Sequence, residues 1–556
     1  MLQVLRLSLN DGLLSIGVAA VLTHILLNRY EPLAMHILVL FFAILPLVLS
    51  QLLIPHFTTP SAVAFGFTLY HLVLLTSVAL YRVSPVHPLA RYPGPIKLKL
   101  ASYFSYKLSI SGKRHLYIQR LHQDYDSDVV RIGPNEISIR DGSCITTILG
   151  SNGLSKGPGY DGRGFFLSNR SLLNWRDPAK HAQRRKPWLR GLNTAAMKHY
   201  EPVLAARITQ LSDILLRKRS EPIDLTQFIT HFSFDFMGDM AFGGGPELMK
   251  DGDTHGLMRR MEAGIKSGLL VEAFPWFAFH ALKIPSIKAR IRAFRASSDA
   301  RARQRILKGT QVKDLFHFLN NDDGAEPVSP SIDDVAAEGS LVVLAGSDTV
   351  SSTLTALMYR LMRHPDVYKK LRAEVDKFYP PGESALDCKY HAKMTYLEAV
   401  INETLRLYPA QPSGSQRATT DATLVAGTHY IPPYTSVRVH VYSIHRDPRN
   451  FSPSPETFWP ERWLIASNPS AWDSQLKKTP FVHNTNAFIP FSYGPANCVG
   501  KNLAMMELRM VVCHLLQQMD FKLAKPDEDH FDEATKDWFG LQVGSLPVEI
   551  TPRLPV

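Results

Sequence analysis

A stretch near the amino end contains no Asp, Glu, Lys or Arg between Leu33 and Leu80. As a helix this stretch would extend about 70 Å, roughly twice the ~30 Å hydrocarbon core of a bilayer. The polar sequence PHFTTPS, at Pro55–Ser61, divides it into two segments. The uncharged run at Gly12–Leu27 adds a third, shorter candidate. The sequence therefore predicts a membrane anchor of two to three transmembrane helices.

Basic residues indicate how this anchor is oriented. The connection at Pro55–Pro60 carries none, whereas Arg82 and Arg91 follow the last apolar segment. The positive-inside rule then places everything beyond residue 81 in the cytosol. The alternative is a cleaved signal peptide at Gly12–Leu27 followed by one buried helical hairpin, but the sequence LLNRYEP does not have the small residues of a cleavage site. We expect residues 1–90 to form the anchor and 91–556 one catalytic domain.

The chain as a whole has the composition of a globular protein, 45% hydrophobic and 20% charged. Its formal net charge is +12, without the basic runs or zinc-finger spacing of nucleic-acid-binding proteins, and we expect no nucleic acid partner. The four cysteines are scattered, which argues against a disulfide scaffold or a structural zinc site. Alternating patterns at Asp128–Asp141, Thr423–His445 and Phe539–Arg553 indicate strands, and helical patterns dominate between Pro178 and Tyr408. The expected fold class is α+β and predominantly helical.

The sequence PFSYGPANCVGKNLAMMELR, from Pro490 to Arg509, leads from a glycine-rich loop through one cysteine into an amphipathic helix. The cysteine, Cys498, is a candidate nucleophile or metal ligand. Gly494 and Gly500 would let the backbone approach a flat cofactor, and Phe491 would pack beside it. Amide N–H groups at the start of the helix would stabilise a thiolate.

A second unusual segment lies in a long apolar pattern from Ser331 to Met362, which predicts one helix of up to ~30 residues. Its middle reads LAGSDTVSST, at Leu344–Thr353. Small and polar residues in the middle of a core helix violate local preference, and such violations often mark functional sites. This segment is therefore a candidate functional site.

These segments together resemble the cytochrome P450 family, and in particular its microsomal fungal members. The cysteine stretch resembles the haem-binding loop of that family. The sequences ETLR at Glu403–Arg406, PERW at Pro460–Trp463, AGSDT at Ala345–Thr349 and HAQRRKPWLR at His181–Arg190 match further family motifs in the right order and spacing. The resemblance covers about Arg91 to Arg553 and implies a P450-like fold.

The resemblance also implies roles for individual residues. Glu403, Arg406 and Arg462 would form a buried ion network, and Thr349 and Asp348 would deliver protons to molecular oxygen. Haem b would be the cofactor, with the thiolate of Cys498 as the axial ligand of its iron. The residues implied in haem binding are Cys498, Arg185, Arg417, His181, Phe491, Gly494 and Gly500. One position departs from the family pattern, because Ala496 stands where the usual loop has an arginine that contacts a haem propionate.

The implied function is a monooxygenase that inserts one oxygen atom from O2 into a lipophilic substrate, such as a terpenoid or another secondary metabolite, at the endoplasmic reticulum membrane. We find no nicotinamide or flavin fingerprint, so electrons would come from NADPH–cytochrome P450 reductase, with cytochrome b5 as a further donor. A basic face formed by Arg184, Lys186, Arg190 and Lys198 would dock that partner. The alternatives are an oxygen-independent haem-thiolate isomerase or dehydratase, against which the Asp348–Thr349 pair argues, and a membrane haem sensor.

The sequence GPGYDG, at Gly157–Gly162, fits the GxGxxG pattern of dinucleotide sites. It follows the polar sequence SNGLSK rather than an apolar strand, and no clear helix is expected after it. We therefore interpret it as part of a flexible loop over the substrate pocket, with Phe165 and Phe166 as candidate pocket walls.

Overall fold

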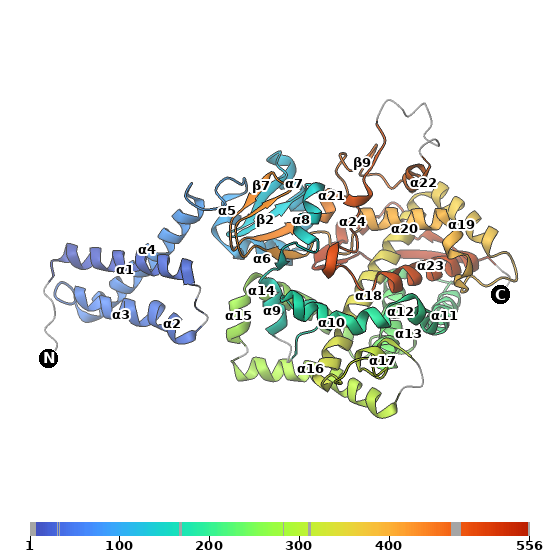
Figure 1. The fold of residues 1–556 in the computed structure, drawn as a ribbon, viewed down its shortest axis with the longest axis horizontal. Helices are drawn as coiled ribbons and strands as arrows, with labels where there is room; N and C mark the ends of the chain where they lie inside the picture. Colours follow the sequence, from blue (N-terminus) through green and yellow to red (C-terminus); the bar gives the residue numbers. More distant parts are fainter. Residues whose placement is uncertain are drawn as a thin grey trace.

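The structure is a computed structural model of the whole chain. It describes residues 7–30, 32, 34–165, 169–281, 283–309, 313–468 and 480–553. A small helical bundle at the amino end projects from a larger body that combines a sheet-rich region with many helices (Figure 1).

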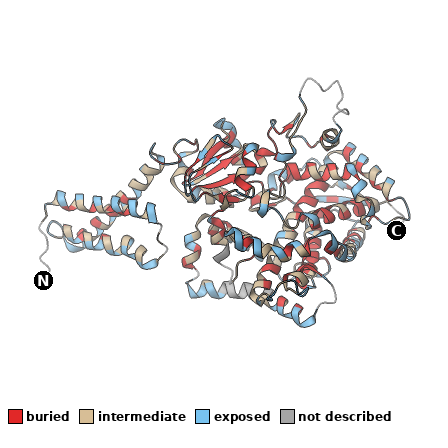
Figure 2. Cartoon of the chain, in the orientation of Figure 1, coloured by how far each residue is buried: buried red, intermediate tan, exposed pale blue. Residues whose placement is uncertain are grey.

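Three apolar segments near the amino end are long enough to cross a membrane. They are α1 (Leu9–Tyr30), the continuous helical segment Met35–Leu53 and α4 (Thr59–Val83). The middle segment comprises α2 (Met35–Val39), η1 (Leu40–Ile44), α3 (Leu45–Ser50) and η2 (Gln51–Leu53). The segments pack on a small core of their own, whereas much of their outer surface is exposed (Figure 2). The break predicted at Pro55–Ser61 is confirmed, and the charge-free stretch is two helices rather than one.

Hydrogen bonds connect the end of the bundle to the body. The guanidinium of Arg131, a buried residue on β1 (Val129–Gly133), donates to the carbonyl of Arg82 at 2.9 Å. Arg82 in turn donates to the carbonyl of Leu100 at 2.5 Å. The linker after the bundle also contacts this strand, because the backbone N–H of Arg131 donates to Pro93 O at 2.7 Å. The bundle is therefore held to the body by specific polar contacts at its last helix.

The sheet-rich region contains a five-stranded sheet in the order β1-β2-β8-β5-β3. Strands β1 and β2 are antiparallel, as the alternating pattern at Asp128–Asp141 predicts, and β2 runs parallel to β8. Smaller sheets join β11, β14 and β4, and pair β6 with β7, β9 with β10, and β12 with β13. The strands are β1 (Val129–Gly133), β2 (Glu136–Ile139), β3 (Ser155–Lys156), β4 (Ile223–Asp224), β5 (Gln416–Ala418), β6 (Thr423–Val425), β7 (His429–Ile431), β8 (Ser436–Val439), β9 (Phe451–Ser452), β10 (Val482–His483), β11 (Met519–Leu523), β12 (Lys536–Trp538), β13 (Gly540–Gln542) and β14 (Pro547–Pro552).

Helices form most of the body. Those before the central helix are α5 (Ile96–Leu100), α6 (Ser102–Ile110), α7 (Arg114–Asp124), α8 (Ile145–Leu149), α9 (Gly159–Phe165), α10 (Pro178–Gly191), α11 (Thr194–Arg217), α12 (Leu225–Phe242), α13 (Leu248–Asp251), α14 (Leu257–Ala273), α15 (Pro275–Ala281), α16 (Pro285–Lys308) and α17 (Leu315–Leu319). The others are α18 (Ile332–Arg363), α19 (Pro365–Phe378), α20 (Thr395–Leu407), α21 (Val441–Ile444), α22 (Glu461–Ser467), α23 (Lys501–Gln518) and α24 (Phe531–Ala534). Short 3-10 turns at η3 (Gly142–Cys144), η4 (Leu172–Asn174), η5 (Cys388–Lys393), η8 (Thr485–Ala487) and η9 (Gly494–Ala496) connect them.

The long helix predicted at Ser331–Met362 is confirmed as α18, which runs through the middle of the body (Figure 1). Ser331 caps it, because its hydroxyl accepts the backbone N–H of Asp334 at 3.2 Å. Although α18 is apolar enough to cross a membrane, most of it is buried against α12, α20 and α23. It therefore serves as the core helix of the body.

Two expectations about secondary structure need correction. The segment Thr423–His445 forms strands only as far as Val439, and Val441–Ile444 then form the short helix α21. A helix, α9, does begin inside the GPGYDG sequence at Gly159. Its glycines allow close packing, because a Cβ on Gly162 would lie 1.9 Å from the carbonyl oxygen of Val271 on α14. This explains the glycines without a dinucleotide site.

Candidate active site

The loop before α23 holds Cys498 through its own backbone. The N–H of Cys498 donates to the carbonyl of Phe491 at 2.8 Å, which closes the loop. Gly494 has φ +73°, and a Cβ there would lie 2.1 Å from Leu149 O, so only glycine fits between this loop and α8. Phe491 is partly buried and packs against the main core. The loop predicted from the sequence is thus a tight turn, built on three hydrogen-bonded or sterically constrained positions.

Opposing effects act on the Cys498 thiol. Burial of its surroundings raises the pKa of Cys498, while the backbone N–H of Gly500 and the charges of Arg185 and Lys501 lower it. The side chain nevertheless keeps exposed surface on one side. Cys498 is therefore accessible to a ligand. The Gly500 N–H and the charges of Arg185 and Lys501 would stabilise its thiolate when it binds a metal cation.

The predicted ion network is present and fully buried. The Arg406 guanidinium contacts both carboxylate oxygens of Glu403, each at 2.8 Å, and Arg462 Nε donates to Glu403 at 3.1 Å. His445 connects this network to the cysteine loop. Its Nδ1 donates to Arg406 O at 3.1 Å, and its Nε2 accepts the backbone N–H of Ile489 at 3.0 Å. Burial lowers the pKa of His445 to about 3, so the ring stays neutral.

One face of α18 presents Ala345 and Thr349, which are one turn apart. Ala345 is exposed although its neighbours Val342 and Ser347 are buried. The Thr349 hydroxyl donates to the carbonyl of Ala345 at 2.7 Å, within the same helix. Gly346 does not share this face, because a Cβ there would lie 2.4 Å from Met237 on α12. Of these two small residues, Ala345 leaves open space on this face of α18 and Gly346 does not.

Asp348 lies beside Thr349 in sequence but in different surroundings. Burial raises the pKa of Asp348 to about 6, and the adjacent Gln542 side chain lowers it only in part. A carboxyl group with this pKa exchanges a proton near neutral pH. Asp348 can therefore act as a proton donor and acceptor at this position on α18.

Arg185, on α10, contacts the cysteine loop directly. Its guanidinium donates to the carbonyl oxygen of Asn497 at 2.7 Å and to the side-chain oxygen of Asn497 at 2.6 Å. Asn497 immediately precedes Cys498. The residue expected to meet a haem carboxylate thus also holds the loop in place.

Three other basic groups lie close to Arg185. His181 is buried one helical turn before it, and burial together with the charges of Lys156, Arg185 and Arg417 lowers the pKa of His181 to about 4. Arg417 is buried on β5, and its Nε has no hydrogen-bond partner among the described residues. Lys156 is buried on the neighbouring strand β3, opposite Arg417 in the antiparallel register. Sequence analysis missed Lys156, because a lysine on a two-residue strand gives no local signal.

These features fit a haem. A thiolate is a suitable ligand for haem iron, and Cys498 is an exposed cysteine just before α23. The surface of Ala345 lies on a helix that is otherwise packed, where a flat cofactor can lie against it. The unpartnered Nε of Arg417 and its basic neighbours suit the carboxylates of the cofactor. Cys498, Arg185, Arg417 and His181 would hold it.

The proposed basic docking face is only partly available. Arg184 pairs with the buried carboxylate of Glu338 on α18 at 2.6 Å and with Asp334 at 3.0 Å. Arg190 pairs with Asp323 at 2.8 Å and with Glu326 at 2.7 Å. Both arginines therefore form ion pairs with acidic residues of the same chain.

The remaining two members of that face differ from the arginines. Lys186 and Lys198 are exposed on α10 and α11. They keep the surface that a partner protein requires. The candidate pocket walls Phe165 and Phe166 stay a prediction, because the Phe165 side chain and all of Phe166 lie outside the described residues.

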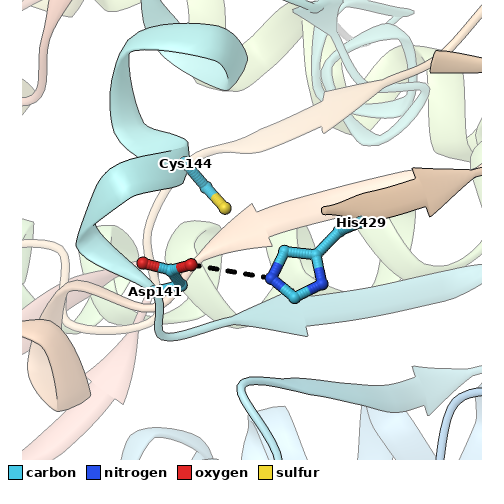
Figure 3. A group of neighbouring side chains, drawn as sticks. All are labelled: Asp141, Cys144 and His429. Atoms are coloured by element: carbon cyan, nitrogen blue, oxygen red, sulfur yellow. Dashed lines mark ion pairs between the residues drawn. The ribbon is translucent and has the colours of Figure 1, made fainter. Parts of the chain in front are cut away.

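Three side chains on the sheet-rich region could bind a metal ion. Asp141, Cys144 and His429 bring their ligand atoms together at the end of β2, and His429 Nε2 lies 3.6 Å from Asp141 Oδ2 (Figure 3). The other Asp141 oxygen accepts the backbone N–H of Ser143 at 2.9 Å. Burial raises the pKa of Cys144 to about 12, so the thiol is protonated. Sequence spacing alone did not indicate this cluster.

Comparisons with known proteins agree with the geometry. A protein-family profile described as "Cytochrome P450" matches residues 102–550. "Cytochrome P450 monooxygenase FCK2" of Fusarium pseudograminearum is 32% identical, over 88% of this chain and 86% of its own length. "Tryprostatin B 6-hydroxylase" of Aspergillus fumigatus is 30% identical, over 87% of this chain and 84% of its own length. Each of these relatives spans most of the chain.

One further relative also covers the amino end of the chain, and one solved structure has a similar fold. "Cytochrome P450 67" of Uromyces fabae is 30% identical and covers 95% of this chain and 97% of its own length. Among solved structures, "Crystal structure of cytochrome P450DA heme domain" matches 80% of this chain and 94% of that chain with a TM-score of 0.65. At 18% identity this last match concerns the fold alone.

Proposed function

The chain belongs to the cytochrome P450 family and is a haem monooxygenase, and from this premise we propose that it is a membrane-anchored enzyme of fungal secondary metabolism. In this proposal it inserts one oxygen atom from O2 into a lipophilic substrate, with electrons from NADPH through a reductase. The cofactor would be haem b, and the thiolate of Cys498 would hold its iron. The isomerase and haem-sensor alternatives are not retained, because the curated relatives are named as monooxygenases and a hydroxylase.

The observation that carries this proposal is the pair of fixed elements around the site. One is the Cys498 loop, which the Phe491 carbonyl and the Asn497–Arg185 contacts hold. The other is α18, which presents Ala345 and Thr349 on one face. The helix after the cysteine, α23, packs directly on α18. A cofactor held by Cys498 would therefore lie beside the small and hydroxylated face of the central helix.

The haem, when bound, supplies the oxygen chemistry, and thiolate ligation favours cleavage of the O–O bond. The chain supplies ligand, orientation and protons. Arg185, Arg417 and His181 would neutralise or solvate the cofactor carboxylates, while Phe491, Gly494 and Gly500 shape the loop. Glu403, Arg406 and Arg462 fix the loop through His445.

Proton delivery is the part assigned to α18. The Thr349 hydroxyl can rotate from the Ala345 carbonyl toward the substrate side and donate or accept there. Asp348 can return a proton to the Thr349 hydroxyl, because its pKa of about 6 lets the carboxyl group exchange protons near neutral pH. The two residues together form a relay that a monooxygenase needs and a binding protein does not.

Location, partner and substrate class follow from the apolar segments and from one named relative. Three apolar segments lie between Leu9 and Val83, and basic residues occur in the last turn of the third segment and after it, as in an anchor with a cytosolic catalytic domain. We place it in the endoplasmic reticulum membrane, where NADPH–cytochrome P450 reductase and cytochrome b5 would supply electrons. A relative that hydroxylates tryprostatin B supports a role in secondary metabolism.

The test is expression of the full chain in yeast microsomes together with a reductase. Reduced protein exposed to carbon monoxide should show the strongly red-shifted Soret band of thiolate ligation, and extracts of the host should gain an oxygenated metabolite that requires NADPH. Cys498→Ser should remove the red-shifted band. Cys388→Ser, a change of a partly buried cysteine on η5, is the matched control and should retain it. A normal band in Cys498→Ser would show that another residue binds the iron.

A further inference from the structure

Lys156 is a buried lysine whose charge lacks a dedicated acidic partner. Its side chain is 8% exposed, and its ammonium donates to the carbonyls of Leu172 at 3.1 Å and Leu173 at 2.7 Å. Among the described residues, no carboxylate oxygen lies within ion-pair distance of this ammonium. Two neutral carbonyls offset only part of the desolvation cost of a buried cation.

Positive charges near Lys156 raise the free-energy cost of burying its ammonium group. Arg417 and Arg185 both lower the pKa of Lys156, and with burial they bring it to about 7. Glu338 is the acid whose charge raises the pKa of Lys156. Its carboxylate already accepts hydrogen bonds from Arg184 and from the indole of Trp188. The cluster therefore has more positive charge than its own acids can neutralise.

Arg417 indicates where the missing anion belongs. It lies opposite Lys156 in the β3–β5 register, and its buried Nε has no hydrogen-bond partner among the described residues. A buried donor without an acceptor is uncommon in proteins, and an anion that binds there is one explanation for it. Two adjacent strands thus present two cations toward one site.

This cluster is next to the cysteine loop. Arg185 belongs to it and donates to Asn497, the residue before Cys498. The turn η9, which contains Ala496, packs against α8, and Gly494 lies against the backbone of Leu149 and Gly150. The chain continues from there into β3 and Lys156. The segment on which the Ala496 turn rests therefore leads directly to the strand that carries Lys156.

We propose that Lys156 binds a carboxylate of the haem and supplies, from β3, the positive charge that the cysteine loop lacks at Ala496. This inference rests on the proposed function only in that the cofactor is haem. It assigns a binding residue that local sequence does not indicate. The carbonyls of Leu172 and Leu173 aim the ammonium, and the carboxylate occupies its remaining donor position.

The test measures how fast the ferric full-length protein, in detergent, transfers haem to excess apomyoglobin. Lys156→Met keeps the length of the side chain and removes its charge, and Lys156→Gln keeps a donor for the two carbonyls. Charge-assisted hydrogen bonds predict that both variants lose haem about 10-fold faster or more. Lys156→Arg should stay close to wild type.

A double variant separates charge from structure. If Lys156 carries the charge of the missing loop arginine, adding Ala496→Arg to Lys156→Met should restore slow haem loss. Haem loss at the wild-type rate in Lys156→Met, full retention in Lys156→Gln, or no rescue by Ala496→Arg would each overturn the proposal. The last two results would mean that the lysine serves only to hold the Leu172–Leu173 turn.

The outcomes distinguish this inference from the proposed function. A wild-type protein that binds no haem would contradict the proposed function itself. A wild-type protein that binds haem normally, with unchanged haem loss in the lysine variants, would contradict only the role of Lys156. Lys180→Met, a change of an exposed lysine on α10, is the control for charge in general and should leave haem loss unchanged.

Discussion

Arg185 holds Asn497 by two hydrogen bonds, one to its backbone carbonyl at 2.7 Å and one to its side-chain oxygen at 2.6 Å. Asn497 directly precedes the cysteine proposed to bind iron. One guanidinium therefore connects α10 to the loop and also lies within the basic cluster for the cofactor. Such a residue affects the loop even before a cofactor binds.

The first prediction concerns this contact. Arg185→Leu should speed haem transfer to apomyoglobin about 10-fold or more, because it removes two charge-assisted hydrogen bonds and one cation. Asn497→Ala should have a smaller effect, since the backbone carbonyl remains as an acceptor. Lys186→Leu, on the next position of α10 and exposed, is the matched control. Equal rates in Arg185→Leu and Lys186→Leu would rule out the anchoring role.

The second prediction concerns His445, which connects the buried ion network to the loop. His445→Phe leaves the Ile489 N–H and the Arg406 carbonyl without their partner, at a cost of about 1–3 kcal/mol in the free energy of unfolding. Haem retention should fall with it. His483→Phe is the control, because neither ring nitrogen of His483 has a hydrogen-bond partner among the described residues. Thermal unfolding of both variants checks the difference, and similar midpoints would refute the connection.

The third prediction concerns Thr349. Thr349→Ala should keep haem and substrate binding, because neither uses the hydroxyl, but proton delivery should fail. NADPH consumption should then continue with hydrogen peroxide as the product, and product per NADPH should fall about 10-fold or more. Thr353→Ala, one turn further along α18 and buried, is the control. Full product yield without extra peroxide would transfer the role to a bound water, since the Ser347 hydroxyl is buried and donates to Ser233 O at 3.2 Å.

The fourth prediction concerns Asp348 and pH. Burial raises its pKa from the ordinary 3.8 to about 6, so the folded protein holds this proton more tightly than the unfolded chain. The ionised form lowers stability as pH rises from about 4 to 6, by up to about 3 kcal/mol above that range. Asp348→Asn should therefore unfold at a higher temperature than wild type at pH 8 and at the same temperature at pH 4. A constant difference across pH would show that Asp348 is not the group that titrates.

The fifth prediction concerns the reductase. Lys186→Glu combined with Lys198→Glu should weaken association with the reductase, and raising the salt concentration should have a similar effect on wild type. Arg190→Ala should instead lower the thermal midpoint, because Arg190 pairs with Asp323 and Glu326 within the protein. Stopped-flow reduction of the haem measures the first effect. Reduction that does not depend on salt would exclude these lysines as the docking face.

Local patterns in the sequence determined several features of this protein. The absence of charged residues between Leu33 and Leu80 predicts apolar helices that are long enough to cross a membrane. The Cys498 loop and the α18 segment are recognisable because glycines, a cysteine and hydroxyl residues occur at fixed short spacings. The conformation that such a short motif adopts depends mainly on its own backbone, so the motif can be recognised without knowledge of the tertiary contacts.

Tertiary structure decided which partner each long side chain has. Arg184, Arg185 and Arg190 look alike in sequence, yet Arg184 binds Glu338, Arg185 binds Asn497, and Arg190 binds residues near α17. Each partner lies more than a hundred residues away, so helical periodicity gives the face of α10 but not what that face meets. Lys156 and Gly346 follow the same rule, because burial and charge at a position depend on the elements that pack against it.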